Sequence, residues 1–384
     1  MLYKLSDVFD LQMGKTPSRD NNMYWKDGNL PWVSIADLSK SQIYIENSKE
    51  MITNLAAKDT LMKCIPQDTV IMSFKLSLGK TAITKTPLYT NEAIMAFIDK
   101  KVIQIEPKYI YFLFCNIKWG QYTNNAVKGK TLNKKFFSDF QIYIPEYTQQ
   151  TKIASLLIRI NKILEYKHSL IKAYDAIIKS RFVELFGDPV LNEKEWNLTS
   201  LESVCKSIYG GGTPSKKNKE YYMGTIPWVT SKDMKSDIIV DSIEHITQLA
   251  IDNSSTRIIP PESVLIVIRS GILKHTLPVC VNKSKVTINQ DLKALVLDEH
   301  CKAIYLQYLL KALEKDILSG VRAVTADNIE FNSLKKRKIP IPPINIQTQF
   351  SQMVNQINKL KSDVQKSIDE TQLLMDSLMQ EYFG

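Results

Sequence analysis

Three Gly-Lys-Thr tripeptides begin at Gly14, Gly79 and Gly129, and the same tripeptide ends the phosphate-binding loop of many nucleotide-binding proteins. Such a loop also needs a glycine five positions earlier, so that backbone amides can wrap the phosphate. The positions in question hold Phe9, Phe74 and Asn124. The tripeptides therefore predict no nucleotide site.

Other residues that could perform chemistry are scattered. The four histidines show no metal-ligand spacing, and the adjacent His300 and Cys301 lack partners nearby in sequence. The five cysteines form no Cys-x-x-Cys pair, which favours reduced packing residues over a zinc site or disulfides. Neither a Gly-x-Ser-x-Gly elbow nor an Asn/Asp-Pro-Pro-Tyr methyltransferase motif is present. We expect no catalytic residue and no metal. A nuclease-type set of carboxylates stays an open alternative, because spacing alone does not decide it and matches to such a pattern often arise by chance.

Length and composition are those of a globular protein with about two domains. The chain has 384 residues, 44% hydrophobic and 23% charged, which excludes disorder. No apolar run approaches the roughly 18 residues of a membrane span, and no secretion signal opens the chain, so we expect a cytoplasmic protein. The net charge of +10 favours a polyanionic partner weakly.

The chain is a duplication with a period near 197 residues. The stretch "MGKTPSRDNNMYWKDGNLPWVSIADLSKS" near the start matches "GGGTPSKKNKEYYMGTIPWVTSKDMKS" downstream, which sets Trp32 against Trp228 and Asp37 against Asp233. The offset is 194 where Ile65 meets Ile259 and 198 where Asn91 meets Asn289. A period this long indicates two whole domains of one kind related by an internal pseudo-two-fold.

Each copy begins with a mixed α+β region. Short apolar runs such as "DTVIMSF" and "ESVLIVI" predict strands, and "IYFLFCNI" and "AIYLQYLLKAL" predict buried helices. The repeated Thr-Pro-Ser predicts a rigid turn, and we assign Trp32 and Trp228 to hydrophobic cores rather than to base stacking.

A long helix then ends each copy. Apolar residues recur at three-four spacing over 150–186 and from 346 onward, which favours two coiled-coil helices over globular core helices. At about 36 residues each would be roughly 54 Å long. The segment "FGDPVLNEKEW" is the expected hinge, and antiparallel helices would hold the two α+β domains at opposite ends of a rigid spacer.

Cations suited to DNA phosphates recur in both copies. "SFKLSLGKTAI" and "VIRSGILKHTLPV" align without a gap, which sets Lys75 against Arg269 and Lys80 against Lys274. Phosphate contacts position a protein on DNA without specifying sequence. Ordinary solvated lysines are an equal alternative for any one of these residues.

Base contacts are expected where the copies differ, because two different half-sites need different donors and acceptors. Examples are Ser77 against Gly271, Thr81 against His275, and the segments 124–131 and 319–325. Variable polar loops also occur on any surface. The full set of candidate DNA-binding residues is Lys15, Arg19, Lys75, Ser77, Lys80, Thr81, Lys128, Lys130, Lys216, Lys217, Arg269, Ser270, Lys274, His275 and Arg322.

The ordered set G-x-TPS, an aromatic pair, PW-V, D, a basic strand, I-x-I-P and a Gln-led long helix, present twice, resembles the specificity subunit of type I restriction-modification systems. The resemblance implies target recognition domains at 1–145 and 198–342, spacer helices at 146–187 and 343–384, and a linker at 188–197. It implies a non-catalytic protein that recognises a bipartite site in double-stranded DNA. It further implies methyltransferase subunits docked on the helices and restriction subunits joined through the complex. S-adenosylmethionine, ATP and Mg would then lie on those partners, with no cofactor in this chain.

One motif departs from the family. The usual helix start of the family, Pro-Pro-Leu-x-Glu-Gln, is replaced by "IPEYTQQ" and "IPPINIQTQ", so the Glu that would lie early in the helix is missing from both. Its absence removes about 0.5 kcal/mol of capping. Two recognition domains on one side of a duplex must lie about 34 Å or a multiple apart, so helix length would set the spacing between half-sites. Three alternatives stay open: a methylation-only system, a structural coiled-coil adaptor, and a fused methyltransferase or nuclease.

Overall fold

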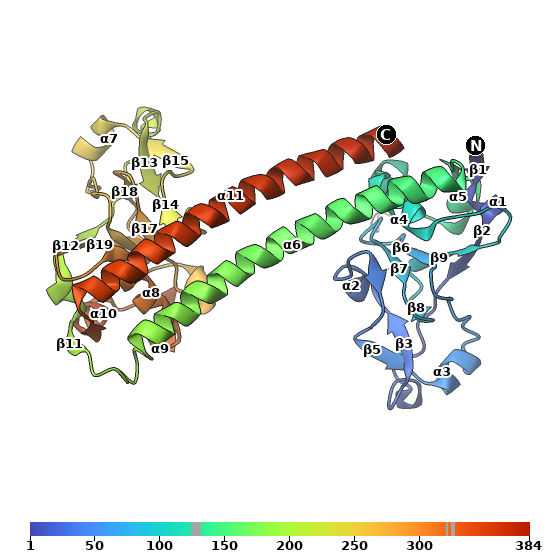
Figure 1. The fold of residues 1–384 in the computed structure, drawn as a ribbon, viewed down its shortest axis with the longest axis horizontal. Helices are drawn as coiled ribbons and strands as arrows, with labels where there is room; N and C mark the ends of the chain where they lie inside the picture. The colour runs from blue at the N-terminus through green and yellow to red at the C-terminus, as the bar shows by residue number, and fades with distance from the viewer. Residues whose placement is uncertain (124–131, 320–321, 324–326) are drawn as a thin grey trace. The chain divides into compact units, whose positions relative to one another are not determined.

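The structure is a computed structural model that describes residues 1–123, 132–319, 322–323 and 327–384 (Figure 1). The chain forms two compact units. Unit 1 comprises residues 1–168 and 366–384, and unit 2 comprises residues 169–365. Each unit therefore combines one α+β region with parts of both long helices.

Unit 1 is built on a five-stranded sheet of order β2-β9-β6-β7-β4, a three-stranded sheet of order β5-β3-β8 and the pair β1-β10. The strands are β1 (Leu2–Lys4), β2 (Phe9–Met13), β3 (Leu30–Val33), β4 (Tyr44–Ile45), β5 (Glu50–Ile52), β6 (Val70–Ser73), β7 (Thr81–Thr84), β8 (Tyr89–Thr90), β9 (Ile94–Asp99) and β10 (Gln141–Tyr143). The helices are α1 (Leu5–Val8), α2 (Ile35–Leu38), α3 (Asn54–Asp59), α4 (Pro107–Asn116) and α5 (Lys134–Asp139), with 3-10 turns η1 (Asn22–Tyr24) and η2 (Trp119–Tyr122).

Unit 2 repeats this plan with sheets β12-β19-β16-β17-β14, β15-β13-β18 and β11-β22, which confirms the duplicated α+β fold. The strands are β11 (Asn197–Ser200), β12 (Cys205–Gly210), β13 (Ile226–Val229), β14 (Ile238–Ile239), β15 (Glu244–Ile246), β16 (Val264–Val267), β17 (Val279–Asn282), β18 (Thr287–Ile288), β19 (Leu292–Leu297), β20 (Arg322–Ala323), β21 (Asp327–Asn328) and β22 (Lys338–Ile341). The helices are α7 (Gln248–Asp252), α8 (Ala303–Ala312), α9 (Glu314–Ser319) and α10 (Phe331–Lys336), with 3-10 turns η3 (Leu201–Val204), η4 (Lys219–Tyr222) and η5 (Gly271–Lys274).

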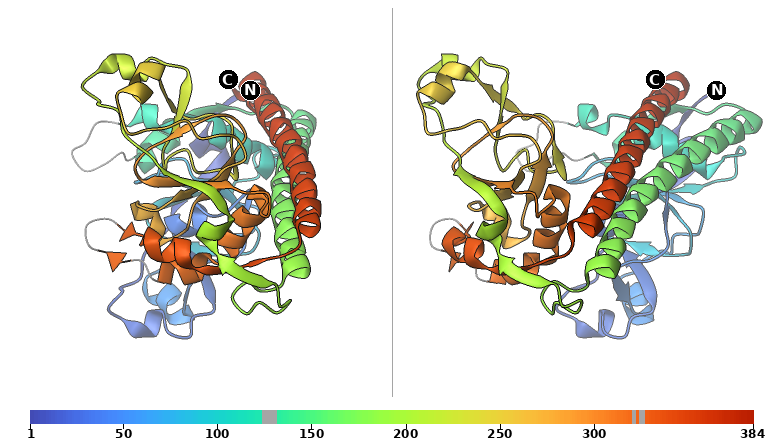
Figure 2. Two further views of the ribbon diagram at one scale, coloured as in Figure 1. Left: turned by 90° about the vertical axis from the view of Figure 1, so that its left-hand side faces the viewer. Right: turned by 60° about the vertical axis from the view of Figure 1, so that its left-hand side comes forward.

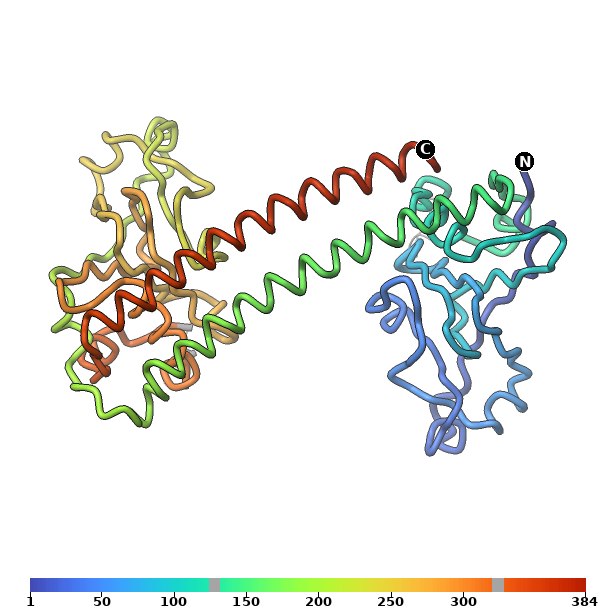
Figure 3. The backbone as a smooth tube through the Cα atoms, in the orientation of Figure 1, coloured from blue at the N-terminus to red at the C-terminus, as the bar shows by residue number. Residues whose placement is uncertain are grey.

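The two long helices, α6 (Tyr147–Phe186) and α11 (Ile344–Phe383), each run unbroken over 40 residues (Figure 3). In unit 1 the start of α6 and the end of α11 lie side by side and share one core (Figure 2). Leu157 and Met375 are buried there, and the Phe383 ring lies 5.2 Å from that of Tyr109. Early residues of α6 thus meet late residues of α11, so the helices are antiparallel.

Unit 2 uses the reciprocal ends of the same helices. Phe182 and Phe186, at the end of α6, pack against Phe350 near the start of α11, with ring centroids 5.6 and 5.4 Å apart. Phe186 also contacts Tyr305 of α8 at 4.8 Å, as Phe383 contacts Tyr109 in unit 1. The repeated Phe-Gly that ends each copy therefore closes the core of the other copy's unit.

The apolar residues of each long helix divide into two stripes. A buried stripe packs in the cores: Ile153, Leu157, Ile160, Leu164, Ile178 and Phe182 on α6, and Phe350, Val354, Ile357, Ile368 and Met375 on α11. Leu156, Ile163, Leu170 and Ile177 recur every seven residues but stay 37 to 51% exposed. The coiled coil is confirmed, but the expectation that the apolar residues of 150–186 all lie in its seam is wrong for these four, which stay exposed while the buried stripe packs in the cores.

A buried glutamine fastens each long helix to its α+β region. Gln150 is 1% exposed, accepts from the Glu106 backbone N–H at 2.9 Å, and donates to the Gln104 and Pro145 carbonyls. Gln347 repeats this with the Lys302 N–H and the His300 and Pro342 carbonyls. Each glutamine near the start of a long helix therefore binds the residue that precedes α4 or α8.

The residues shared by the opening stretches are scaffold. Trp32 and Trp228 are 2% and 3% exposed, which confirms the core assignment, and each indole N–H donates to a backbone carbonyl, of Lys15 and Gly212 respectively, at 3.0 Å. Asp37 accepts from the Ser34 and Lys49 N–H groups, and Asp233 accepts from the Thr230 and Ile243 N–H groups. Partial burial raises the pKa of Asp37, but its hydrogen bonds with Ser34 and Lys49 outweigh this and lower the pKa overall.

Candidate nucleic-acid interface

Four segments of unit 1 meet at one end of the five-stranded sheet, because β2 and β6 end where β9 and β7 begin. Backbone hydrogen bonds join them in sequence: Lys15 N to Thr90 O, Phe74 N to Ala93 O, and Leu132 N to Phe74 O. We name this end the unit 1 loop face and define it as residues 14–18, 74–80, 90–93 and 132.

Unit 2 has the same arrangement. The Gly212 N–H donates to the Ile288 carbonyl, the Ile268 N–H to the Asp291 carbonyl, and the Ile329 N–H to the Ile268 carbonyl. The unit 2 loop face comprises residues 211–215, 268–278, 288–291 and 328–329. Each unit therefore places the loop after its central strand, one of the variable regions that the sequence singled out, beside Leu132 or Ile329.

The loop between the paired strands differs in length between the copies. Met72 pairs with Thr81, and the equivalent Ile266 pairs with Val279, so the connection contains four more residues in unit 2. The gapless alignment is therefore wrong beyond this loop. Thr81 corresponds to Val279 instead of His275, and Lys80 corresponds to Pro278 instead of Lys274. The sequence carries a sign of this insertion, because the offset between the copies rises from 194 at Ile65 and Ile259 to 198 at Asn91 and Asn289.

The unit 1 loop face carries Lys75, Ser77 and Lys80 in one seven-residue loop. Ser77 and Lys80 are exposed, and Lys75 is half-buried with its Nζ 5.3 Å from the centre of the Phe74 ring. Thr81 is 7% exposed and donates its hydroxyl to the Gly79 carbonyl at 3.0 Å. Its burial within β7 leaves Thr81 poorly placed for contact with a base.

The unit 2 loop face carries Arg269, Ser270, Lys274 and His275. Arg269 forms two contacts with Asp291, through Nε at 2.8 Å and through a terminal nitrogen at 2.7 Å. Ser270 caps η5, and Lys274 and His275 are exposed. The backbone of Arg322 lies in β20, which pairs with β21, and Asn328 of β21 bridges to Arg269.

Lys15 and Arg19 are engaged within unit 1. The Lys15 ammonium donates to the Thr60 carbonyl at 2.7 Å, at the end of α3. Arg19 forms two hydrogen bonds with Glu50 and stacks 3.9 Å from the centre of the Trp25 ring. The bond to Arg19 lowers the pKa of Glu50, and the bond to Glu50 raises the pKa of Arg19. Both cations stabilise the α+β region in the positions seen here.

The remaining candidates are Lys216 and Lys217, which are exposed just before η4, and Lys128 and Lys130, which lie outside the described residues. The candidates within the described residues therefore form two groups in the fold. One group lies on the loop faces, and the other, which includes Arg19 and Lys216, lies beside the three-stranded sheets.

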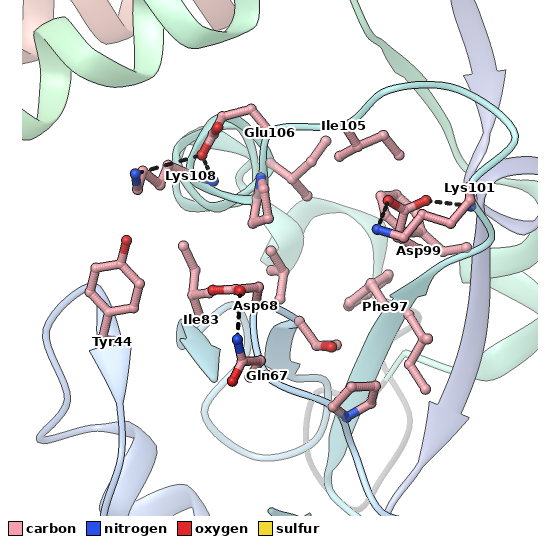
Figure 4. Close-up of a pocket in the computed structure, with 17 residues that line it drawn as sticks. Tyr44, Gln67, Asp68, Ile83, Phe97, Asp99, Lys101, Ile105, Glu106 and Lys108 are labelled. Atoms are coloured by element: carbon pink, nitrogen blue, oxygen red, sulfur yellow. Dashed lines mark hydrogen bonds and ion pairs between the residues drawn. The ribbon is translucent and has the colours of Figure 1, made fainter. Parts of the chain in front are cut away.

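A cavity of about 570 Å³ opens at the opposite end of the unit 1 sheet, beside the start of α4 (Figure 4). Its charged groups are paired with near neighbours in sequence, Lys101 with Asp99 at 2.9 Å and Lys108 with Glu106 at 3.9 Å. Gln67 likewise donates to Asp68. Each of these polar groups therefore interacts with a residue one or two positions away in sequence.

Within the described ranges, no three His, Cys, Asp or Glu side chains come close enough to hold a metal ion. The five cysteines are free thiols. No described helix combines the length and the apolar character needed to cross a membrane.

Sequence reasoning missed one residue of the interface and the role of two glutamines in the scaffold. Leu76, at the centre of the unit 1 loop, is 74% exposed, and no spacing pattern marked it. Gln150 and Gln347 stood in the repeated helix start, but only coordinates show their hydrogen-bond partners.

Two α+β units with matching loop faces, joined by two long helices that each contribute to both cores, are the architecture of DNA specificity subunits. A family model described as "Type I restriction modification DNA specificity domain" matches residues 1–173 and 193–371, so the chain belongs to this family. Recognition of DNA sequence is the role that membership implies, and the subunits of this family are generally non-catalytic.

Relatives of known name support the assignment. The type I restriction enzyme MjaIX specificity subunit of Methanocaldococcus jannaschii is 26% identical over 400 residues, which cover 98% of this chain and 90% of that protein. The EcoR124I/EcoR124II specificity subunit of Escherichia coli is 29% identical over 268 residues, 68% of this chain and 65% of that protein. The crystal structure of the type I S subunit from M. genitalium has the same fold, with a TM-score of 0.62, 12% identity and coverage of 100% of this chain and 96% of that chain.

Proposed function

We propose that this chain is the specificity subunit of a type I restriction-modification complex and recognises a bipartite target in double-stranded DNA. Each loop face would contact one half-site. The observation that carries the proposal is the pairing of identical scaffolds with different loops: the same backbone bonds hold both faces, while the loop after β16 is four residues longer than that after β6.

The charges on the loop faces suit this role. Lys75, Lys80 and Lys274 would neutralise phosphates, while Ser77, Ser270 and His275 offer hydroxyl and imidazole groups to base edges in the major groove. Arg269 would contact DNA either in place of Asp291 or while it keeps its ion pair with Asp291. Lys128, Lys130 and Arg322 belong to segments next to these faces in sequence, and we propose them as further phosphate or base contacts.

We further propose that two methyltransferase subunits dock on the exposed stripes of the long helices. Leu156, Ile163, Leu170 and Ile177 of α6 have counterparts 197 residues later on α11: Met353, Leu360, Ser367 and Leu374. Of the counterparts, Leu360 and Leu374 are 48% and 51% exposed. Met353 packs against the core of unit 2 and Ser367 accepts from Lys167, so α11 repeats the exposed apolar stripe at Leu360 and Leu374. Two stripes related in this way fit two copies of one partner, and heptad spacing fits a partner helix.

The chemistry would take place on the partner subunits. S-adenosylmethionine would bind the methyltransferase subunits, and ATP and Mg would serve a restriction subunit joined through the complex, in the cytoplasm. A methylation-only system would use this chain in the same way without the restriction subunit.

Selection from a random duplex library with the chain and its methyltransferase tests the proposal. We expect a motif of two short half-sites separated by unspecified bases, with binding that weakens steeply as salt rises. A structural adaptor would instead give no motif and no gain in DNA affinity over the methyltransferase alone. Binding of S-adenosylmethionine by the isolated chain would support a fused methyltransferase.

A further inference from the structure

The β6–β7 loop of unit 1 is held at both ends by hydrogen bonds. The Ser73 hydroxyl donates to the Ser77 carbonyl and accepts from the Lys80 N–H at 3.0 Å, while the Gly79 N–H donates to the Ser73 carbonyl at 2.9 Å. Gly79 adopts φ +80° beneath Trp119, where a Cβ atom would lie 2.7 Å from the ring. These contacts tie the second half of the loop to Ser73 at the end of β6.

Leu76 stands at the centre of this loop with two unfavourable features. Its side chain is 74% exposed, and its backbone φ is 64°. The left-handed region is sterically unfavourable for a bulky side chain, and an exposed leucine gains no burial in return. Backbone strain at an exposed position often marks a functional contact.

Leu61 provides an internal comparison. It is 78% exposed with φ 51°, but it follows the end of α3, where the next residue, Met62, donates its N–H to the Ala57 carbonyl. A left-handed residue is a common way to end a helix, so the conformation of Leu61 has a local explanation. Leu76 ends no helix and has no such explanation.

The neighbours of Leu76 indicate what it could contact. Lys75 and Ser77 flank it, and Lys80 closes the loop. In the major groove the thymine 5-methyl group is the apolar feature that an aliphatic side chain can recognise, beside phosphates that attract lysine. In unit 2 the corresponding loop contains η5, with Ile272 only 39% exposed, so the two loop faces present different apolar groups.

We propose that Leu76 is a specificity-determining residue that contacts the 5-methyl group of a thymine in the half-site bound by unit 1. This inference rests on the proposed function. The hydrogen bonds to Ser73 restrain the loop before DNA arrives, which reduces the conformational entropy lost on contact.

Deoxyuridine tests the contact, since it differs from thymidine only by the methyl group. With the selected duplex, the full chain and its methyltransferase, each thymine is replaced in turn and affinity is measured. We expect one position at which deoxyuridine weakens binding about fourfold, the effect of one buried methyl group. Leu76→Ala should weaken binding to the thymine duplex at least as much and should remove the difference between the two bases at that position.

Leu61→Ala is the matched control, because it alters a leucine of similar exposure and backbone conformation outside the loop face. Leu61 contacts Lys15 of that face through its backbone carbonyl, at 3.3 Å, and the substitution keeps this carbonyl. It should leave affinity and deoxyuridine sensitivity unchanged. Leu76→Asn is a second variant that tolerates the left-handed conformation, so its melting temperature should not fall while discrimination is lost. The measurement on the native chain needs no variant.

Two results would overturn the inference while leaving the proposed function intact. One is a unit 1 half-site without a methyl-sensitive thymine, and the other is full discrimination retained by Leu76→Ala. A failure to select any bipartite motif would instead refute the proposed function itself.

Discussion

Replacement of the buried glutamines should reveal how each long helix is fastened to its α+β region. Gln150→Ala removes three hydrogen bonds of 2.9 to 3.0 Å and leaves the Glu106 N–H and two carbonyls without their partner. At about 1 kcal/mol net for each bond, the free energy of unfolding of unit 1 should fall by about 3 kcal/mol. For a unit of this size that corresponds to roughly 6 to 12 °C in melting temperature.

Gln347→Ala provides the reciprocal variant in unit 2, and exposed Gln149→Ala is the control on the same helical turn. Calorimetry measures the change in stability, and amide hydrogen exchange shows which backbone N–H groups lose their hydrogen bonds. The Glu106 N–H should lose protection in Gln150→Ala, and the Lys302 N–H should lose it in Gln347→Ala. If Gln150→Ala costs no more than Gln149→Ala, or if Glu106 keeps its protection, the glutamine does not fasten the helix.

Three further predictions concern charge and docking. Arg19→Gln should lower the free energy of unfolding by about 0.5 to 1 kcal/mol near neutral pH, because it removes the partly exposed pair with Glu50 and the ring contact. Arg19 lowers the pKa of Glu50, so this loss should be complete above about pH 4.3 and should shrink as the pH falls through the lowered pKa, as measured by urea unfolding. Lys80→Gln should weaken DNA binding whatever the sequence and reduce the slope of log affinity against log salt by about 1, as measured by fluorescence anisotropy. Ile163→Glu, on the exposed stripe, should weaken methyltransferase binding at least tenfold in calorimetric titration without lowering the melting temperature, since a carboxylate cannot be buried in an apolar interface.

Each of these has a control within the chain. Lys216→Gln removes the exposed cation that aligns with Arg19 and should leave stability unchanged at every pH. Lys194→Gln lies in the linker and should preserve the salt slope. Val183→Glu changes a residue of α6 that is 51% exposed but off the heptad stripe, so methyltransferase binding should persist. An equal effect of a variant and its control would contradict the corresponding explanation.

The duplicated fold could be predicted from the sequence because its signals are local and repeated. Trp32 and its counterpart each donate to one backbone carbonyl, and Asp37 and its counterpart each accept from two backbone N–H groups. The strands and helices follow apolar runs that any copy of the fold needs. The burial of Trp32 followed from its size and its place at a strand start.

The details of the interface could not be predicted in the same way. The loop after β6 is four residues shorter than its counterpart after β16. Matching polar residues between the copies does not locate this gap, whereas the pairing of the flanking strands does. The sequence predicted Arg19 as a DNA contact, but in the fold its guanidinium forms an ion pair with Glu50, which lies 31 residues away in sequence. Both failures come from contacts between segments that are distant in the chain.

The helix stripes show a third limit. Three-four spacing identified which residues of α6 are apolar, but it could not separate the side buried by the α+β regions from the side left exposed. Leu157 and Leu156 are neighbours in sequence, yet one is fully buried and the other is 37% exposed. Only the packing partners decide which of two apolar stripes lies inside.

The central claim is that each loop face recognises its own half-site, and sequencing of the DNA that the complex methylates tests it most directly. The motif from the native chain is compared with that from a variant in which residues 75–80 carry a different loop sequence on intact strands. We predict that one half-site changes while the other half-site and the spacing between them stay the same. A change in both half-sites, or an unaltered motif, would contradict the account.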